Sequence, residues 1–311
     1  MKNGFKLIIC LSIVFIVSFS IFFAISNFFP SDFVVAERNF YKQDLSDKKI
    51  IALLGSSHVG MLNVTHIENE LNTDGYSFSV YNLAVKGDIP EKRAKTIDEL
   101  ISMKPKLVVY GISYRDLNVP VSNPLPDPKE YFHDFISQLD VIQNPKIVTL
   151  EKIRTLQSTW FASSKEITWK NTPFMTYDPI TEMQIMNETV LKNQIPISES
   201  SKINLGNAST NKQVSFLINS INELKKHNIK VIVYATPLHR FYLEGLDQTQ
   251  KDAFNSILEK ITEDTGIKIY NLTQKYDDMA IWSNISHIAF NENSLAYSED
   301  IANIIESEIE K

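Results

Sequence analysis

The sequence predicts an α/β domain in which a central parallel sheet of five strands lies between two layers of helices. Short apolar runs of β type alternate with amphipathic helical stretches along most of the chain, which is the pattern of such a sheet. The 311 residues include 43% hydrophobic and 22% charged residues, so the apolar content is sufficient for one packed core. A third feature, a long apolar segment at the N-terminus, predicts a transmembrane helix in addition to the domain.

The N-terminal segment is long enough to cross a bilayer. The run from Phe5 to Phe29 carries one charge, Lys6, and a transmembrane helix needs ~20 apolar residues. A cleaved signal peptide is the alternative, but its apolar region usually has only ~7–15 residues and ends at a small-residue site. We therefore expect an uncleaved anchor over residues 1–30, followed by a linker over 31–48.

Charge and cysteine content limit the environment and the partners of the domain. Lys2 and Lys6 precede the apolar run, so the positive-inside bias predicts a single-pass protein with a cytoplasmic N-terminus and an extracellular or periplasmic domain. The one cysteine, Cys10, lies inside the apolar run, so the domain has no disulfide and no cysteine-based metal site. A net charge of -6 without a basic stripe argues against nucleic-acid binding.

The elements of the domain are expected in the order β-α-β-α-β, an insertion, then α-β-α-β-α. In the helix at 211–227, for example, Val214, Leu217, Ile221 and Leu224 recur at helical spacing and form an apolar face. The predicted strands are Lys49 to Leu54, Ser77 to Leu83, Lys106 to Gly111, Lys230 to Ala235 and Lys268 to Asn271. The predicted helices are His58 to Leu71, Pro90 to Met103, Asn211 to His227, Gln248 to Thr265 and Ser294 to Ile309.

The stretch from about 120 to 201 interrupts this alternation and is rich in Pro, Asn, Ser and aromatic residues. We expect an insertion between the third and fourth strands that forms a partly helical subdomain with its own small core. A long functional loop over an active site is the alternative. The domain therefore extends over residues 49–311 with an insertion at about 120–201.

The first candidate for chemistry follows the first strand, because ligands of such sheets bind beyond the carboxyl ends of the strands. The residues there are Gly55-Ser56-Ser57-His58. A hydroxyl at the start of a helix lies at the positive end of the helix dipole, where a developing oxyanion is stabilised. An ordinary serine N-cap accounts for the same residues.

Two segments after the second and third strands add polar groups to this edge. The segment from Asn82 ends in Gly87, whose backbone N–H can approach a substrate closely or can serve a turn. The segment after the third strand offers a hydroxyl, a cation and a carboxylate, although a capped turn with a surface ion pair explains it equally well. These three groups belong to Ser113, Arg115 and Asp116.

Two histidines come late in the chain at the same edge. His239 and Arg240 follow the fourth strand, where they can meet an anionic or sugar substrate or belong to a turn fixed by Pro237. The segment from Trp282 delivers His287 immediately before the last helix. A lone histidine in such a place is more often structural than catalytic.

A serine after the first strand and a histidine before the last helix resemble the SGNH hydrolase family, also called the GDSL-like family. The resemblance spans about residues 49–309 without the insertion, and the family's blocks read Gly-Asp-Ser, a glycine, Gly-x-Asn-Asp and Asp-x-x-His. By position, Ser57 resembles the nucleophile, Gly87 the oxyanion-hole glycine and His287 the general base. The resemblance implies a flavodoxin-like three-layer α/β/α fold, strand order 2-1-3-4-5, and no metal or organic cofactor.

Three positions depart from the family's pattern. Ser56 replaces the aspartate of the first block, Ser113 stands in place of the oxyanion-hole asparagine, and Asn284 replaces the aspartate that orients the histidine. An asparagine can hold the imidazole but cannot stabilise the imidazolium, and this swap in a serine triad can cost ~10⁴ in rate. Either activity is low or another carboxylate substitutes, and the candidates are Asp116, Asp277 and Asp278.

Two functions from different classes follow from this resemblance. The first is a serine-dependent O-acyl esterase or acyltransferase acting on extracellular glycans or envelope polymers, in which Ser57 attacks and His287 takes the proton. The Ser57 and Gly87 amides and the Ser113 hydroxyl would bind the oxyanion. The second is an inactive module that binds a glycan or scaffolds a cell-envelope complex. A separation near ~3 Å between Ser57 Oγ and His287 Nε2 favours the enzyme.

Overall fold

The computed structural model describes residues 40–43, 45, 47–73, 75–119, 167–169, 171–179, 181–194 and 203–309. The chain divides into two compact units, residues 1–44 and 45–311, and the second contains the central sheet. The predicted anchor at 1–30 lies outside the described residues. Within the described ranges, no helix has the length and apolar character needed to span a membrane.

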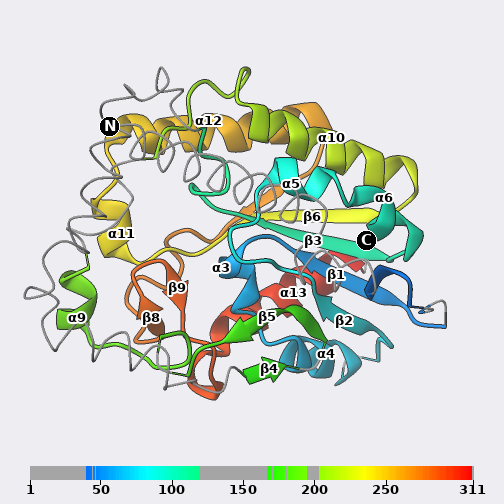
Figure 1. Cartoon of the computed structure of the whole chain (residues 1–311), viewed down its shortest axis with the longest axis horizontal. Coiled ribbons are helices and arrows are strands. Elements are labelled where there is room, and N and C mark those ends of the chain that lie inside the picture. The colour runs from blue at the N-terminus through cyan, green and yellow to red at the C-terminus, as the bar shows by residue number, and fades with distance from the viewer. Residues whose placement is uncertain are drawn as a thin grey trace, which may run out of the picture. The chain divides into compact units, whose positions relative to one another are not determined.

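Five parallel strands form the central sheet in the order β2-β1-β3-β6-β7 (Figure 1). In chain order this is 2-1-3-4-5, so the predicted strand order is confirmed. β1 and β3 lie inside the sheet and are buried along their whole length, which is why their sequences are continuous apolar runs and do not alternate. The strands are β1 (Ile50–Leu54), β2 (Ser79–Asn82), β3 (Leu107–Ile112), β6 (Lys230–Ala235) and β7 (Ile269–Asn271).

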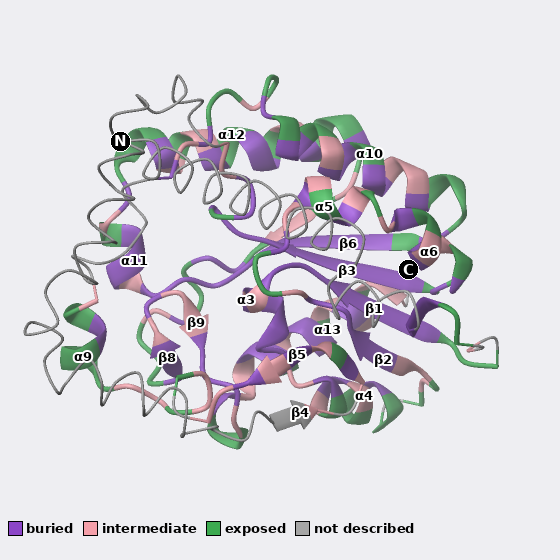
Figure 2. Cartoon of the chain, viewed as in Figure 1, coloured by how far each residue is buried: buried purple, intermediate pink, exposed green. Residues whose placement is uncertain are grey.

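Helices cover both faces of this sheet and complete the three-layer arrangement (Figures 1 and 2). On one face α10 packs against α5, α6 and α12, and on the other α13 packs against α4. The apolar face expected for α10 is buried, and Asn211 begins this helix by accepting hydrogen bonds from the backbone N–H groups of Gln213 and Val214. These helices are α4 (Val64–Thr73), α5 (Pro90–Ala94), α6 (Ile97–Ser102), α10 (Lys212–Lys226), α12 (Gln248–Thr265) and α13 (Ala296–Ile309).

Two helices that the sequence predicts as continuous are each broken in two. The segment expected as one helix over 58–71 forms α3 (Ser57–Gly60) and then α4. The break occurs because the side chain of Asn63 accepts a hydrogen bond from the backbone N–H of His66 and so begins a new helix. The helix expected at 90–103 divides in the same way, into α5 and α6, with Thr96 at the start of the second.

The described part of the insertion packs against the domain, and its aromatic residues do not form a separate core. β4 (Ile167–Trp169) and β5 (Thr172–Tyr177) form an antiparallel pair, and β5 contacts β2 and α3. The ring of Tyr177 stacks on Phe290 at 4.0 Å, and its hydroxyl donates to the Gly60 carbonyl at 2.5 Å. One helix of the insertion is described, the short α9 (Glu188–Lys192), and the expectation of a partly helical subdomain stays a prediction because most of residues 120–201 lie outside the described ranges.

Candidate active site

A tight junction between β1 and α3 places the first serine of the site. Gly55 has a φ of +142°, and a Cβ atom there would lie 2.5 Å from Val59 Cγ2 and 2.6 Å from the Gly111 carbonyl oxygen. Only glycine fits this approach of α3 to β3. Ser57 is the first residue of α3 and is half-buried. Because α3 follows β1 directly, Ser57 lies at the carboxyl end of the sheet.

A small hairpin that the sequence did not predict places the histidine. β8 (Trp282–Asn284) and β9 (His287–Ile288) are antiparallel, and Asn284 is the cross-strand partner of His287. β9 contacts α3, so the hairpin lies against the β1–α3 junction (Figure 1). Two residues far apart in the sequence, Ser57 and His287, are thereby brought together.

The side chains of Ser57, His287 and Asn284 form a continuous hydrogen-bonded series. Ser57 Oγ lies 2.8 Å from His287 Nε2, and His287 Nδ1 lies 3.1 Å from Asn284 Oδ1. The amide oxygen of Asn284 can only accept a hydrogen bond, so Nδ1 of His287 carries the hydrogen and Nε2 is left to accept a hydrogen bond from the Ser57 hydroxyl. This is the arrangement of a nucleophile, a general base and an orienting group.

Ser286 is a further member of this series that sequence reasoning missed. Its hydroxyl lies 2.9 Å from His287 Nδ1 and donates to Asn284 Oδ1 at 2.8 Å. Asn284 Oδ1 also accepts the backbone N–H groups of Ser286 and His287, both at 2.9 Å. Asn284 therefore shapes the hairpin turn as well as orienting the imidazole. The only sequence signal for Ser286 was its position beside the candidate histidine.

The surroundings of His287 keep its imidazole neutral. Burial, followed by the positive charges of Arg115 and Lys86, lowers the pKa of His287 to about 4. The ring is therefore unprotonated at neutral pH and available as a base. Arg115 is exposed, and its charge acts on this ring, which is consistent with its predicted place after the third strand, at the carboxyl edge of the sheet.

The start of α3 leaves backbone donors for an oxyanion. Ser56 occupies the N-cap position but makes no capping hydrogen bond, so the ordinary N-cap interpretation of this serine is wrong. Its hydroxyl bonds to His58 Nδ1 at 3.1 Å, and hydrogen bonding by the same side chain lowers the pKa of the Asp116 carboxyl. The first backbone N–H groups of α3, those of Ser57 and His58, therefore receive no side-chain cap. Because α3 has only four residues, these amides matter more than a helix dipole.

The other predicted oxyanion groups differ in their surroundings. Gly87 is exposed with a φ of +68°, in a turn that an ordinary side chain rarely adopts. Ser113 is buried and is engaged with Asp116, whose carboxylate accepts the Ser113 backbone N–H at 2.8 Å and whose backbone N–H donates to the Ser113 hydroxyl oxygen at 3.4 Å. The Ser113 hydroxyl is thus committed to Asp116, which leaves backbone N–H groups as the better oxyanion donors.

The remaining candidates have structural partners of their own. His239 begins α11 (Arg240–Glu244), since its Nδ1 accepts the backbone N–H of Phe241 at 3.1 Å. The side chain of Asp278 is 97% exposed and lies 3.6 Å from Arg240. Neither His239 nor Asp278 has a described contact with His287, and the described residues contain no cluster able to hold a metal ion.

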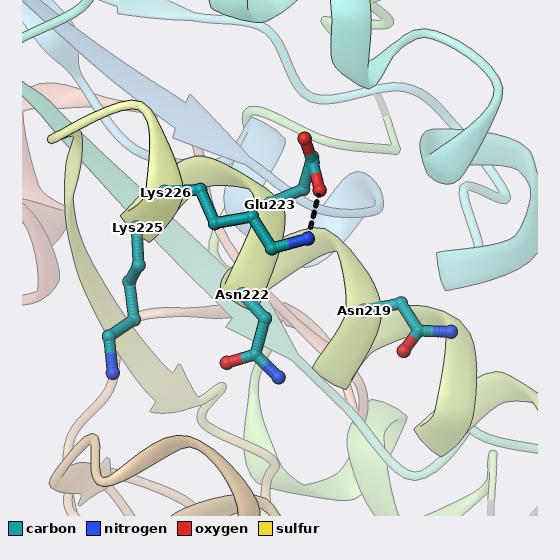
Figure 3. Close-up of a pocket in the computed structure, with 5 residues that line it drawn as sticks. All are labelled: Asn219, Asn222, Glu223, Lys225 and Lys226. Atoms are coloured by element: carbon teal, nitrogen blue, oxygen red, sulfur yellow. Dashed lines mark hydrogen bonds and ion pairs between the residues drawn. The ribbon is translucent and has the colours of Figure 1, made fainter.

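A hollow lies away from these side chains, on the C-terminal half of α10 (Figure 3). Its volume is about 670 Å³. Because α10 leads into the first residue of β6, this half of the helix lies near the amino ends of the strands, opposite to Ser57. The described lining residues are Asn219, Asn222, Glu223, Lys225 and Lys226.

No protein-family model matches the sequence, and no curated protein matches it. Among solved structures, the chain is similar to an acetyl xylan esterase, AlAXEase, with 13% identity, a TM-score of 0.43, and coverage of 84% of this chain and 99% of the other. It is similar to the psychrotrophic esterase EstA from Pseudoalteromonas sp., with 9% identity, a TM-score of 0.42, and coverage of 85% and 100%. It is also similar to TesA, with 11% identity, a TM-score of 0.35, and coverage of 71% and 76%. The side chains at the carboxyl end of the sheet therefore carry the functional assignment.

Proposed function

We propose that this chain is a serine-dependent O-acyl esterase or acyltransferase. One observation carries the proposal, the 2.8 Å hydrogen bond between Ser57 Oγ and His287 Nε2. This separation meets the requirement for a nucleophile and its base. A module that only binds a glycan needs no such contact.

The proposed reaction begins with attack of Ser57 Oγ on the ester carbonyl carbon, while His287 Nε2 takes the hydroxyl proton. The backbone N–H groups of Ser57 and Gly87 stabilise the oxyanion that forms. The intermediate collapses, the ester C–O bond breaks, and His287 returns the proton to the departing alcohol. Water or a sugar hydroxyl then releases the acyl group from Ser57, again with His287 as base.

The proposed substrate is an acylated glycan or envelope polymer outside the cell. Two features support it, the cationic residues Arg115 and Lys86 whose charges reach His287, and the apolar run at 5–29 that predicts a membrane anchor. Single-pass anchoring, with the domain facing outward, would keep the site close to such polymers.

Fluorophosphonate labelling tests the nucleophile without knowledge of the substrate. The probe forms a covalent bond with an activated serine, so the unmodified protein should be labelled, and Ser57→Ala should abolish labelling and esterase activity. The substitution removes a hydroxyl without opening a large cavity, so the midpoint of thermal unfolding should change little.

Ser283→Ala is the matched control, since its buried hydroxyl donates to the His287 carbonyl oxygen at 3.2 Å and does not touch the reacting atoms. We expect this variant to be labelled. Full activity in Ser57→Ala, or an unmodified protein that never labels, would favour the binding module over the enzyme.

A further inference from the structure

A second imidazole lies against the face of the proposed base. The ring centroids of His58 and His287 are 4.6 Å apart, and the ring planes differ by 17°. His58 is only 6% exposed, and burial lowers its pKa well below the ordinary value, so it is neutral. The Ser57–His287 pair does not itself require a polar ring here, because an apolar side chain would fill the same space.

A buried chain of hydrogen bonds fixes the orientation of His58. His58 Nδ1 lies 3.1 Å from Ser56 Oγ, and the Ser56 side chain interacts with the Asp116 carboxyl closely enough to lower its pKa by hydrogen bonding. Asp116 is 4% exposed and is held in place by the backbone N–H of Ser113 at 2.8 Å. Two polar side chains, Ser56 and His58, thus lead from the buried carboxyl group of Asp116 to the face of His287.

The protonation states of Asp116 and His58 determine which group donates and which accepts in the series Asp116, Ser56 and His58. When Asp116 is ionised, its carboxylate can accept a hydrogen bond from the Ser56 hydroxyl, and Ser56 Oγ in turn accepts one from the N–H at His58 Nδ1. His58 Nε2 then carries a lone pair, and this buried atom has no hydrogen-bond partner within the described part of the chain. The ring that faces His287 is therefore polarised by a negative charge.

We infer that Asp116, acting through Ser56 and His58, is a positioning residue that supplies the negative charge that Asn284 cannot give to His287. The inference rests on the proposed function. Asp277 and Asp278, the other two candidate carboxylates, have no described hydrogen bond leading to His287.

The physical basis is the charge that develops during the reaction. His287 becomes an imidazolium when it takes the Ser57 proton, and Arg115 and Lys86 both oppose that positive charge. An electron-rich ring stacked on the imidazolium stabilises it, as the face of an aromatic ring stabilises a cation. The same low-dielectric surroundings that disfavour the imidazolium make the effect of Asp116 larger.

The charge state of Asp116 gives the inference a measurable signature. Burial raises the pKa of Asp116 to about 7, the hydrogen bonds from Ser56 and Ser113 oppose this shift, and the charge of Asp88 adds to it. The carboxylate is therefore present above pH 7 and is lost as the pH falls. Turnover should rise through a step near pH 7, well above the step near pH 4 that belongs to His287.

The experiment measures rates of fluorophosphonate labelling and of p-nitrophenyl acetate hydrolysis between pH 5 and 9. In Asp116→Asn the step near pH 7 should disappear, and the rate at pH 8 should fall on the order of tenfold, the effect of about one pKa unit. His58→Phe keeps a flat ring but loses Nδ1, and Ser56→Ala breaks the chain, so both should also lose the step. Asp277→Asn is the matched control and should keep it.

The outcomes separate this inference from the proposed function. If the unmodified protein labels and Asp116→Asn keeps both its rate and its step, the inference is wrong and the enzyme remains. If the unmodified protein never labels, the proposed function fails and the inference with it. Circular dichroism checks the fold of each variant, and if Asp116→Asn does not fold, the profiles of Ser56→Ala and His58→Phe decide.

Discussion

At the scale of single residues, Asn284 combines two tasks that differ in their chemical requirements. Its Oδ1 atom accepts backbone hydrogen bonds that shape the turn between β8 and β9, and it also receives the Nδ1–H of His287. Either an amide or a carboxylate oxygen can perform the first task. Only a carboxylate can also stabilise the imidazolium, so the amide keeps the geometry and gives up part of the rate.

Asn284→Asp tests this division of tasks. The substitution keeps the acceptor oxygen and adds a negative charge beside Nδ1, so esterase activity should rise by up to a few orders of magnitude. The added charge favours the imidazolium, so the pKa of His287 should rise from about 4 and the acid limb of the rate profile should move to higher pH.

The gain should be larger when Asn284→Asp is combined with Asp116→Asn, because the new carboxylate then replaces the charge lost from Asp116. The pH–rate profiles of the two variants and their combination provide the measurement. An unchanged or lower rate in Asn284→Asp would mean that Asp116 already supplies the charge in full or that the site is not a triad.

Position after the ends of the strands, together with the resemblance to the SGNH hydrolase family, indicated Ser57, His287 and Asn284. It gave no signal for His58, whose place depends on a ring stacking across two elements distant in sequence. The commitment of Ser113 to Asp116 was also unpredicted, since it depends on side-chain orientation within one turn. The sequence shows which residue types follow each strand, but it does not show which hydrogen-bond partner each hydroxyl has.

At the scale of elements, the site depends on how closely α3 approaches β3. The strand and helix order was predicted correctly because apolar periodicity is a property of the sequence itself. The break between α3 and α4 was not predicted, because it depends on the Asn63 side chain capping a new helix. The β8–β9 hairpin was also missed, since its strands are only three and two residues long.

Gly55→Ala tests the closeness of the β1–α3 junction. A Cβ atom at Gly55 would lie 2.6 Å from the Gly111 carbonyl oxygen, a backbone atom that cannot move without distorting β3. We expect a loss of about 3 kcal/mol in the free energy of unfolding, with loss of labelling at Ser57 as α3 shifts. Urea denaturation measures the first effect, and the fluorophosphonate assay measures the second.

Gly75→Ala is the matched control for this substitution. Gly75 also has a positive φ, +88°, but nothing lies within 4 Å of the added Cβ atom. Only backbone strain remains, so the loss should be about 1–2 kcal/mol, and labelling should not change. Equal losses in the two variants would show that the approach of α3 to β3 is not tight.

At the scale of the whole molecule, the sequence predicts that a membrane anchor at 1–30 precedes the domain. The lysines at positions 2 and 6 precede the apolar run, whereas Asp32 and Glu37 are the first acidic residues after it. This distribution of charge predicts that the N-terminus stays in the cytoplasm and that the domain faces outward. An outward-facing esterase would meet polymers that no cytoplasmic enzyme can reach.

Protease added to intact cells tests this topology. It should degrade the domain and leave only a short fragment around the anchor, whereas a domain at 72–311 that is fully protected in sealed cells would overturn the prediction. The mass of the purified protein separates an uncleaved anchor from a cleaved signal peptide, which would remove the apolar run. A cytoplasmic marker that stays intact confirms that the cells are sealed, and detergent should expose that marker to the protease.

Moving the basic residues, by Lys2→Gln and Lys6→Gln with Ser31→Lys and Asp32→Lys, should invert the orientation and protect the domain, because the bias in lysine placement sets the direction of insertion.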